Sequence, residues 1–515
     1  MKTEEKRTVP NAIRIHPSDN VAVALATIVA GSVVGAGGAK VEARAEIPRG
    51  HKIALARVSA GDPVIKYGFP IGNATQDILP GDWVHSHNLA TGLSGTIEYE
   101  YRPAKAGSGE VARGTQNPVG GRAKSPTFMG YRRADGRVGT RNEVWILNTV
   151  GCVNHAAERI AKGAAEKIGN EVDGAYAFSH PYGCSQLGDD LRNTQSVLAG
   201  LMRHPNAGGI LVLGLGCESN QMDDLLARAG DIDRSRLKFF NSQDVMDEIA
   251  EGGSVLGSLI ERMKSDKREQ CPASELVIGN KCGGSDGLSG ITANPLVGRI
   301  ADRITSLGGG AILTEVPEMF GAEQVLMARA ANEKVFSDLV GMINRFKEYF
   351  TSHGQPIYEN PSPGNIVGGL TTLEEKSLGA IQKGGQATVT GVLRYGEQAP
   401  KSGLSLLESP GNDGVSSTAM TVSGATLLLF TTGRGTPLGF PVPTIKVSSN
   451  SAIAEKKPHW IDFNAGAVLD GTATEDQLTD GLFDLALDVA SGKKKARNEE
   501  NGYREIAIWK EGVTL

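Results

Sequence analysis

Four of the five cysteines in this 515-residue chain follow apolar, strand-like runs, each with glycine beside it or close by. They are Cys152, Cys184, Cys217 and Cys282, and His180 lies four residues before the second of them. The carboxyl ends of parallel strands converge where ligands bind, so residues far apart in sequence can share one site. Thiolates with an imidazole suit zinc, iron or an iron–sulfur cluster better than magnesium or calcium. For any single cysteine, the alternative is a small buried hydrophobe.

A second group of polar residues suits a small anionic ligand. The stretch 282–290, CGGSDGLSG, offers backbone N–H groups and hydroxyls, and its glycines allow the close approach of an anion-binding nest. Arg434 lies between two glycines and is placed to grip a carboxylate, with a solvated arginine on a tight turn as the alternative. Glu315 and Glu318 follow another apolar run. They are candidates for acid–base work or metal ligation, although carboxylates are also expected where a helix starts.

Four of the nine histidines lie in the first fifth of the chain: His16, His51, His85 and His87. Histidine titrates near neutral pH and binds metals. A catalytic or metal-binding role is therefore open for this group, and a structural or exposed role is the alternative for each member.

The pattern of apolar runs predicts how the chain is organised. Residues 1–102 contain short runs such as 21–25, 51–58 and 65–72, with glycines at roughly ten-residue spacing, which is typical of a small all-β module. Residues 103–127 are rich in Gly, Pro and Ser and indicate a flexible linker. From residue 128, apolar runs alternate with helical patterns, which predicts a doubly wound, Rossmann-like α/β region with parallel strands. A break near 356–369 predicts two subdomains, 128–355 and 356–515.

Charge and composition limit the classes of partner that we expect. The chain has 53 Lys+Arg against 58 Asp+Glu, so no basic field favours nucleic acid or anionic lipid, and neither partner is expected. Residues 21–39 carry no charge, but four glycines interrupt the run, so we expect strands here and no membrane span. Five cysteines and no secretory signal fit a reducing cytoplasm.

Longer stretches resemble the altronate/galactarate dehydratase family of sugar-acid dehydratases. They are IHPSDNVAVAL, RGHKIAL, GYRRADGRVGTRNE, SHPYGCSQLGDD, GLGCE, CGGSDGLSGITANP, TEVPEMFGAE, NPSPGN and TTGRGTP. The resemblance implies that residues 1–102 form a SAF-type, β-clip-like module. It also implies loss of water from D-altronate to give 2-dehydro-3-deoxy-D-gluconate, with dependence on ferrous iron. TVGCVN, the pair His85 and His87, and the terminal REIAIWKEGVTL are similar to the altronate branch, whereas CPASEL around Cys271 is similar to the galactarate branch.

Dehydration of a 2,3-dihydroxy acid needs a base for the proton next to the carboxylate and help for the departing hydroxide. Our hypothesis assigns iron to some of the four strand-end cysteines with His180; an iron–sulfur cluster or Mn²⁺ is the alternative. His51, His16 or Glu315 is the expected base or acid. Arg434 has a catalytic and a substrate-binding role, and the remaining substrate-binding residues are Gly283, Gly284, Ser285, Asp286 and Asn294. We expect a homodimer. The alternative functions are a galactarate or other sugar-acid dehydratase and a sugar-acid-binding protein without turnover.

Overall fold

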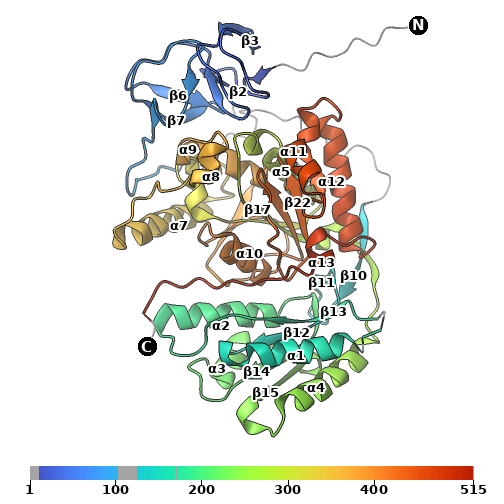
Figure 1. Ribbon diagram of the computed structural model, residues 1–515. Helices are drawn as coiled ribbons and strands as arrows, with labels where there is room; N and C mark the ends of the chain where they lie inside the picture. The colour runs from blue at the N-terminus through green and yellow to red at the C-terminus, as the bar shows by residue number, and fades with distance from the viewer. Residues whose placement is uncertain (1–10, 102–124, 167, 170, 514–515) are drawn as a thin grey trace, which may run out of the picture.

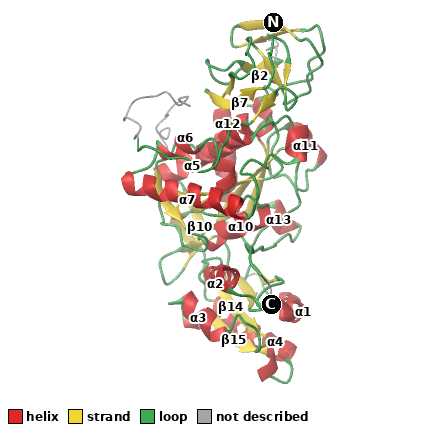
Figure 2. Cartoon of the chain, turned by 90° about the vertical axis from the view of Figure 1, so that its left-hand side faces the viewer, coloured by secondary structure: helices red, strands yellow, loops and turns green. Residues whose placement is uncertain are grey.

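The computed structural model describes residues 11–101, 125–166, 168–169 and 171–513, which form three parts stacked along one direction (Figure 1). The β module, residues 11–101, lies at one end. The seven-stranded domain, residues 273–513, lies in the middle, and the four-stranded domain, residues 140–264, lies at the other end (Figure 2). Most of the expected linker, residues 103–124, lies outside the described residues.

The β module contains short antiparallel strands, as the glycine spacing predicts. One sheet has the order β1-β2-β5-β8, a second has the order β6-β7-β9, and β3 and β4 form a hairpin. Their bounds are β1 Ala12–Ile13, β2 Val21–Ala24, β3 Val33–Ala36, β4 Ala39–Glu42, β5 Lys52–Ala54, β6 Pro63–Lys66, β7 Phe69–Ala74, β8 Trp83–Val84 and β9 Leu89–Ala90. The uncharged run 21–39 therefore contains strands, and no helix in the described part of the chain is long and apolar enough to cross a membrane. The run 65–72 is divided between two strands, because Tyr67 and Gly68, both with positive φ, form the turn of the β6–β7 hairpin.

The four-stranded domain has a parallel sheet with helices on both faces. The order is β13-β12-β14-β15, with β12 Glu143–Asn148, β13 Gly174–Phe178, β14 Ala207–Gly214 and β15 Leu237–Asn241. Val144 and Ile146 pack with α1 (Asn154–Ala165) and α4 (Glu248–Met263). Trp145 and Leu147 pack with α2 (Gly188–Met202) and α3 (Met222–Ala229). Because side chains alternate along a strand, a strand covered on both faces is apolar throughout.

The seven-stranded domain has one parallel sheet in the order β19-β20-β18-β17-β21-β22-β23. Its strands are β17 Val277–Cys282, β18 Gly310–Leu313, β19 Val389–Leu393, β20 Gly403–Leu407, β21 Leu427–Thr432, β22 Thr444–Ser448 and β23 Phe463–Asn464. Its helices are α5 Ala293–Ser306, α6 Glu323–Met327, α7 Glu333–Ser352, α8 Pro363–Val367, α9 Leu373–Ala380, α10 Asp413–Val422, α11 Ser451–Lys456, α12 Glu475–Ala490 and α13 Arg497–Glu500. The domain boundary expected at 355/356 falls inside this sheet, because β17 and β18 precede it and β19 to β23 follow it.

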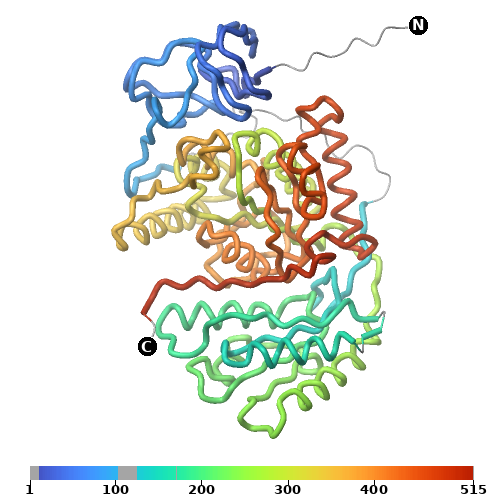
Figure 3. The backbone as a smooth tube through the Cα atoms, viewed as in Figure 1, coloured from blue at the N-terminus to red at the C-terminus, as the bar shows by residue number. Residues whose placement is uncertain are grey.

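A small three-stranded sheet joins the two α/β domains. It contains β11 (Val138–Gly139), β10 (Thr127–Arg132) and β16 (Glu269–Pro272), and the buried Cys271 lies in β16. The C-terminal segment then runs along the boundary between the same two domains (Figure 3), and its Gly512 N–H donates to Asp190 of α2 at 2.9 Å.

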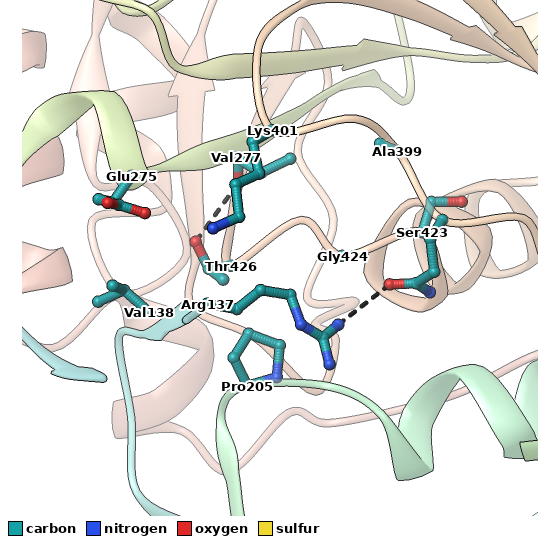
Figure 4. A pocket seen from close by; sticks show the side chains of 11 residues that line it. Arg137, Val138, Pro205, Glu275, Val277, Ala399, Lys401, Ser423, Gly424 and Thr426 are labelled. Atoms are coloured by element: carbon teal, nitrogen blue, oxygen red, sulfur yellow. Dashed lines mark hydrogen bonds between the residues drawn. The ribbon is translucent and has the colours of Figure 1, made fainter. Parts of the chain in front are cut away.

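The seven-stranded sheet presents the amino ends of its central strands to the four-stranded domain. Just before β21 begins, the Thr426 carbonyl accepts from Thr140 Oγ1 (2.9 Å) and the Ala425 carbonyl accepts from His204 Nε2 (3.0 Å). A small hollow at this junction is lined by residues such as Arg137, Pro205 and Lys401 (Figure 4). The carboxyl ends of the strands, where ligands bind in parallel sheets, therefore point away from the four-stranded domain.

Candidate active site

The central strands β17 and β21 lie at the point where the order of the seven-stranded sheet reverses. From β17 the chain continues to β18 on one side, and it later returns through β21 on the other. Ligands of open parallel sheets bind outside the carboxyl ends of the strands at such a point. Cys282 is the last residue of β17, so this rule places it at the candidate site.

Three buried acidic or thiol side chains meet there: Cys282, Glu315 and Glu318. Their ligand atoms all lie within 4.8 Å of one another. The Cys282 thiol lies 3.0 Å from Glu318 Oε2, and Glu315 Oε2 accepts the Cys282 backbone N–H at 3.2 Å. The structure thus brings together Cys282 and the two glutamates that follow β18.

Three buried lysines, which the sequence analysis missed, neutralise this group. Lys383 Nζ lies 2.7 Å from both Cys282 Sγ and Glu315 Oε2. Lys281 binds the other oxygen of Glu315 and lies 2.9 Å from Asp413 Oδ1, and Lys376 lies 2.9 Å from Glu318 Oε1. A signal was present in the sequence, because a lysine in the otherwise buried strand VIGNKC must have a partner.

Burial and these neighbours set the ionisation of the cluster. Burial, together with Glu315 and Glu318, raises the pKa of the Cys282 thiol to about 12, so the thiol is neutral. Burial alone would raise the pKa of Glu318, but Lys376, Lys383 and Lys281 lower it to about 2. Burial likewise opposes the charged forms of Lys281 and Lys383, yet neighbouring acidic groups raise both pKa values.

The donor set Cys282, Glu315 and Glu318 does not fit a divalent cation as it stands. Lys281, Lys376 and Lys383 already supply three positive charges to three carboxylates, counting Asp413. These ammonium groups already bind the carboxylate oxygens that a metal ion would need as ligands, and their positive charge would repel the ion. The arrangement suits acid–base chemistry and stabilisation of negative charge.

Glu315 also has a strained backbone. Its φ is 71°, in the left-handed region that few non-glycine residues adopt. Such strain persists where the surrounding contacts hold it, and it gathers at functional sites. Here the backbone turn after β18 aims the carboxylate at Lys281 and Lys383.

The loop after β17 is braced by two of its predicted binding residues. Asp286 accepts from the Ser289 backbone N–H (2.8 Å) and from the Ser449 hydroxyl (2.9 Å). Asn294 donates to the Gly379 carbonyl at 2.9 Å and accepts from Thr431. Both side chains hold the loop in place and have these partners within the protein.

The same loop has an exposed side. Gly284 is exposed, and its carbonyl accepts the backbone N–H of Arg434 at 3.1 Å. The Arg434 side chain is exposed, and no hydrogen bond or ion pair of its guanidinium occurs among the described residues. Residues 283–287 also match the GxSxG pattern of serine hydrolases, but in the described part of the chain no histidine binds the Ser285 hydroxyl. A free guanidinium above a glycine loop suits a carboxylate.

The histidines of the β module dock that module on residues 366–369. His51 donates through Nε2 to the Val367 carbonyl (3.2 Å) and accepts at Nδ1 from Trp83 (3.3 Å), and burial lowers its pKa to about 4. His85 donates through Nε2 to the Ile366 carbonyl at 3.1 Å. His51 is therefore neutral with both nitrogens engaged.

Two buried lysines complete this contact, whereas His16 lies apart from it. Lys52 and Lys66 both bind Glu375 of α9, at 2.8 and 2.7 Å. His16 is half-buried and bonded to Ser18.

The predicted five-residue metal set is divided between two sheets. Cys152, Cys184 and Cys217 are exposed at the carboxyl ends of β12, β13 and β14 in the four-stranded domain. His180 is buried beside them. Cys282 belongs to the other sheet, whose carboxyl ends point away from that domain, so the structure does not bring the five together.

The fold and the cluster define an enzyme of the α/β class. Three family models match the chain in succession: the altronate/galactarate dehydratase SAF domain over residues 10–92, the D-galactarate dehydratase/altronate hydrolase second domain over 130–264, and the D-galactarate/altronate dehydratase C-terminal domain over 273–514. The chain belongs to the D-galactarate/altronate dehydratase family.

Individual relatives cover the whole chain. Altronate dehydratase of Bacillus subtilis (strain 168) and altronate dehydratase of Escherichia coli (strain K12) are each 50% identical over 505 residues, or 98% of this chain and 99% of the relative. The L-threo-forming galactarate dehydratase of Escherichia coli (strain K12) is 34% identical over 526 residues, or 98% of each chain.

Proposed function

We propose that this chain is a hydro-lyase that converts D-altronate to 2-dehydro-3-deoxy-D-gluconate and water. The observation that carries the proposal is 50% identity over nearly the full length to two altronate dehydratases, against 34% to a galactarate dehydratase. The acid–base cluster at the end of β17 supports an elimination next to a carboxylate.

Substrate binding is assigned to the exposed side of the loop after β17. Arg434 binds the carboxylate of the sugar acid, and the backbone at Gly283 and Gly284 allows close approach. Asp413, whose side chain is 35% exposed, binds Lys281 and so connects this surface to the buried cluster around Glu315. The reacting carbons therefore enter beside Asp413, with the carboxylate on Arg434.

The chemistry is assigned to the buried cluster. A base removes the proton at C2, the C3–O bond breaks, and the hydroxide leaves as water after taking a proton. The resulting enol then becomes the 2-keto acid. Glu315 is the base, and the ammonium groups of Lys281 and Lys383 stabilise the negative charge that builds on the carboxylate. Cys282, a neutral thiol, and Lys383 are the proton donors that face Glu315.

Ferrous iron, which the family resemblance implies, supplies a Lewis acid when bound, but no step above is routed through it. For the chain as a whole we infer that both α/β sheets are doubly wound and Rossmann-like, that the protein is a homodimer, and that it works in the cytoplasm. Exposed thiols support the last inference, because they persist in a reducing compartment.

The test is anaerobic incubation of the purified chain, with ferrous iron added, against a panel of aldonates and aldarates while 2-keto acid is measured. We expect turnover of altronate and, with Glu315→Gln, loss of turnover with retained altronate binding. Turnover of galactarate without turnover of altronate would replace the substrate assignment. Tight binding without any turnover would indicate a binding protein.

A further inference from the structure

Three exposed thiols lie at one edge of the four-stranded sheet. They belong to Cys152, Cys184 and Cys217, whereas Cys271 and Cys282 are buried. Free cysteine is among the residue types most often buried, and an exposed thiol is open to oxidation. Three exposed thiols at equivalent places on three strands therefore indicate a ligand.

The strand register brings the three loops to the same level. β12 lies between β13 and β14, with Leu147 opposite Phe178 and Asn148 opposite Leu213. Neighbouring strands lie about 4.8 Å apart, so the two outer loops start roughly 10 Å from each other. A small cofactor with several atoms spans such a width, and a single ion does not.

Hydrogen bonds fix the loops to one another. Gly151 N–H donates to the Tyr182 carbonyl (2.9 Å), and Asn220 donates to the carbonyls of Gly183 (3.0 Å) and Thr149 (2.9 Å). A Cβ on Gly183 would lie 2.1 Å from the Thr149 carbonyl oxygen, so only glycine allows this approach. The three cysteines are thus held on a preformed frame.

The surroundings favour negative charge at this edge. Helices α1, α2 and α3 begin just after the three loops, and none of them has a side-chain cap on its N-terminus. Helices α4, α7, α9, α10, α11 and α12 all have one, whereas α5 and α6 also lack one. Free N-terminal N–H groups stabilise anions. In addition, Gln243 Nε2 donates to Cys217 Sγ at 3.6 Å.

The distance between the cysteine sulfurs distinguishes an iron–sulfur cluster from a single metal ion. Sulfurs on one tetrahedral ion lie roughly 4 Å apart, since each metal–sulfur bond is ~2.3 Å. Within the described ranges, the one group of three His, Cys, Asp or Glu side chains with ligand atoms within 4.8 Å of one another is that of Cys282, Glu315 and Glu318. In a four-iron cluster each cysteine binds a different iron, so the thiolates lie farther apart.

We propose that Cys152, Cys184 and Cys217 bind a four-iron iron–sulfur cluster whose fourth iron has no protein thiolate. His180 is not the fourth ligand, because Nε2 donates to the Asn148 carbonyl (2.8 Å) and Nδ1 accepts from Tyr182 N–H (3.2 Å). The fourth iron is open to water or to a hydroxyl or carboxylate oxygen. The proposal does not rest on the proposed function.

The test transfers a preformed four-iron, four-sulfide cluster carried by small thiolates to the full chain without oxygen. Three protein thiols replace three small thiolates, which leave as thiols, so no electron is exchanged. We expect about four iron and four acid-labile sulfide per chain, with an iron–sulfur absorption band. Each of Cys152→Ser, Cys184→Ser and Cys217→Ser should lose most of both, and Cys271→Ser, the matched control, should lose neither.

Alkylation of the unmodified chain gives a second measurement that needs no variant. Before transfer, iodoacetamide should label the three exposed cysteines and spare the two buried ones; after transfer, the same three should be protected. Iron bound without sulfide, or equal labelling before and after transfer, would overturn the proposal. Full cluster content in a triple serine variant would do the same.

Discussion

Replacing Arg434 by glutamine should weaken substrate binding without weakening the fold. Within the described part of the chain its guanidinium has no protein partner, and its backbone bond to Gly284 does not depend on the side chain. Exposed substitutions of this kind change the free energy of unfolding by no more than about 0.5 kcal/mol. A hydrogen bond between charged groups contributes about 1.5–3 kcal/mol. Since 1.36 kcal/mol is a factor of ten in rate, kcat/KM should fall about 10- to 150-fold.

The assay is formation of 2-keto acid from altronate, with a thermal melt on the same samples. The loss should appear in both KM and kcat, because Arg434 binds the carboxylate in the ground state and negative charge builds on the same carboxylate when the C2 proton is removed. Arg434→Lys should recover part of the loss. Arg57→Gln is the matched control, since Arg57 is an exposed arginine paired with Asp77 on the β module. An unchanged kcat/KM in Arg434→Gln, or a loss explained by a lower Tm, would refute the assignment.

Three other perturbations test the cluster, the docking of the β module and the domain junction. Lys383→Met removes one of the two ammonium groups that bind Glu315 and leaves two buried lysines for three carboxylates. One negative charge of the cluster is then uncompensated, so unfolding should cost up to about 3–5 kcal/mol less and kcat should fall; equal urea midpoints would contradict this. Gly287→Ala places a Cβ 2.0 Å from the Gly50 carbonyl oxygen and should expose the β module to protease, whereas Gly95→Ala, with nothing within 4 Å, should not. Burial lowers the pKa of His204 to about 3, so the unfolded state binds more protons between pH 6.5 and pH 3, and stability is lost as the pH falls through this window. The loss from pH 7 to pH 5 should be about 2 kcal/mol, and a His204→Gln chain with the same acid sensitivity would contradict it.

The sequence predicted the strands well wherever apolar runs were long. The runs that became β12, β14 and β21 are buried on both faces, so their composition alone marks them. The sequence could not divide those strands between two sheets, because periodicity describes one strand at a time and carries no information on which strands pair. The boundary expected at 355/356 was wrong for that reason.

The site shows the same limit. Glu315, Cys282 and Arg434 were candidates because each follows an apolar run, with Cys282 predicted as a metal ligand. Lys383 was missed because it lies in a short 3-10 turn, Ile381–Gly384, and reaches Glu315 across 68 residues of sequence. His51 was predicted as a base from its usual pKa, which burial and two hydrogen bonds alter in the folded chain.

In the contact between the β module and residues 366–369, side chains of the β module bind backbone carbonyls of residues 366–369. His51, His85 and Lys52 bind the carbonyl oxygens of Val367, Ile366 and Gly369. A carbonyl is the same whichever side chain its residue carries, and the Val367 side chain is 69% exposed. The side chains of Ile366 and Val367 can therefore change over evolution without loss of docking, whereas Gly369 cannot, because a Cβ there would lie 2.4 Å from the Gly50 carbonyl oxygen.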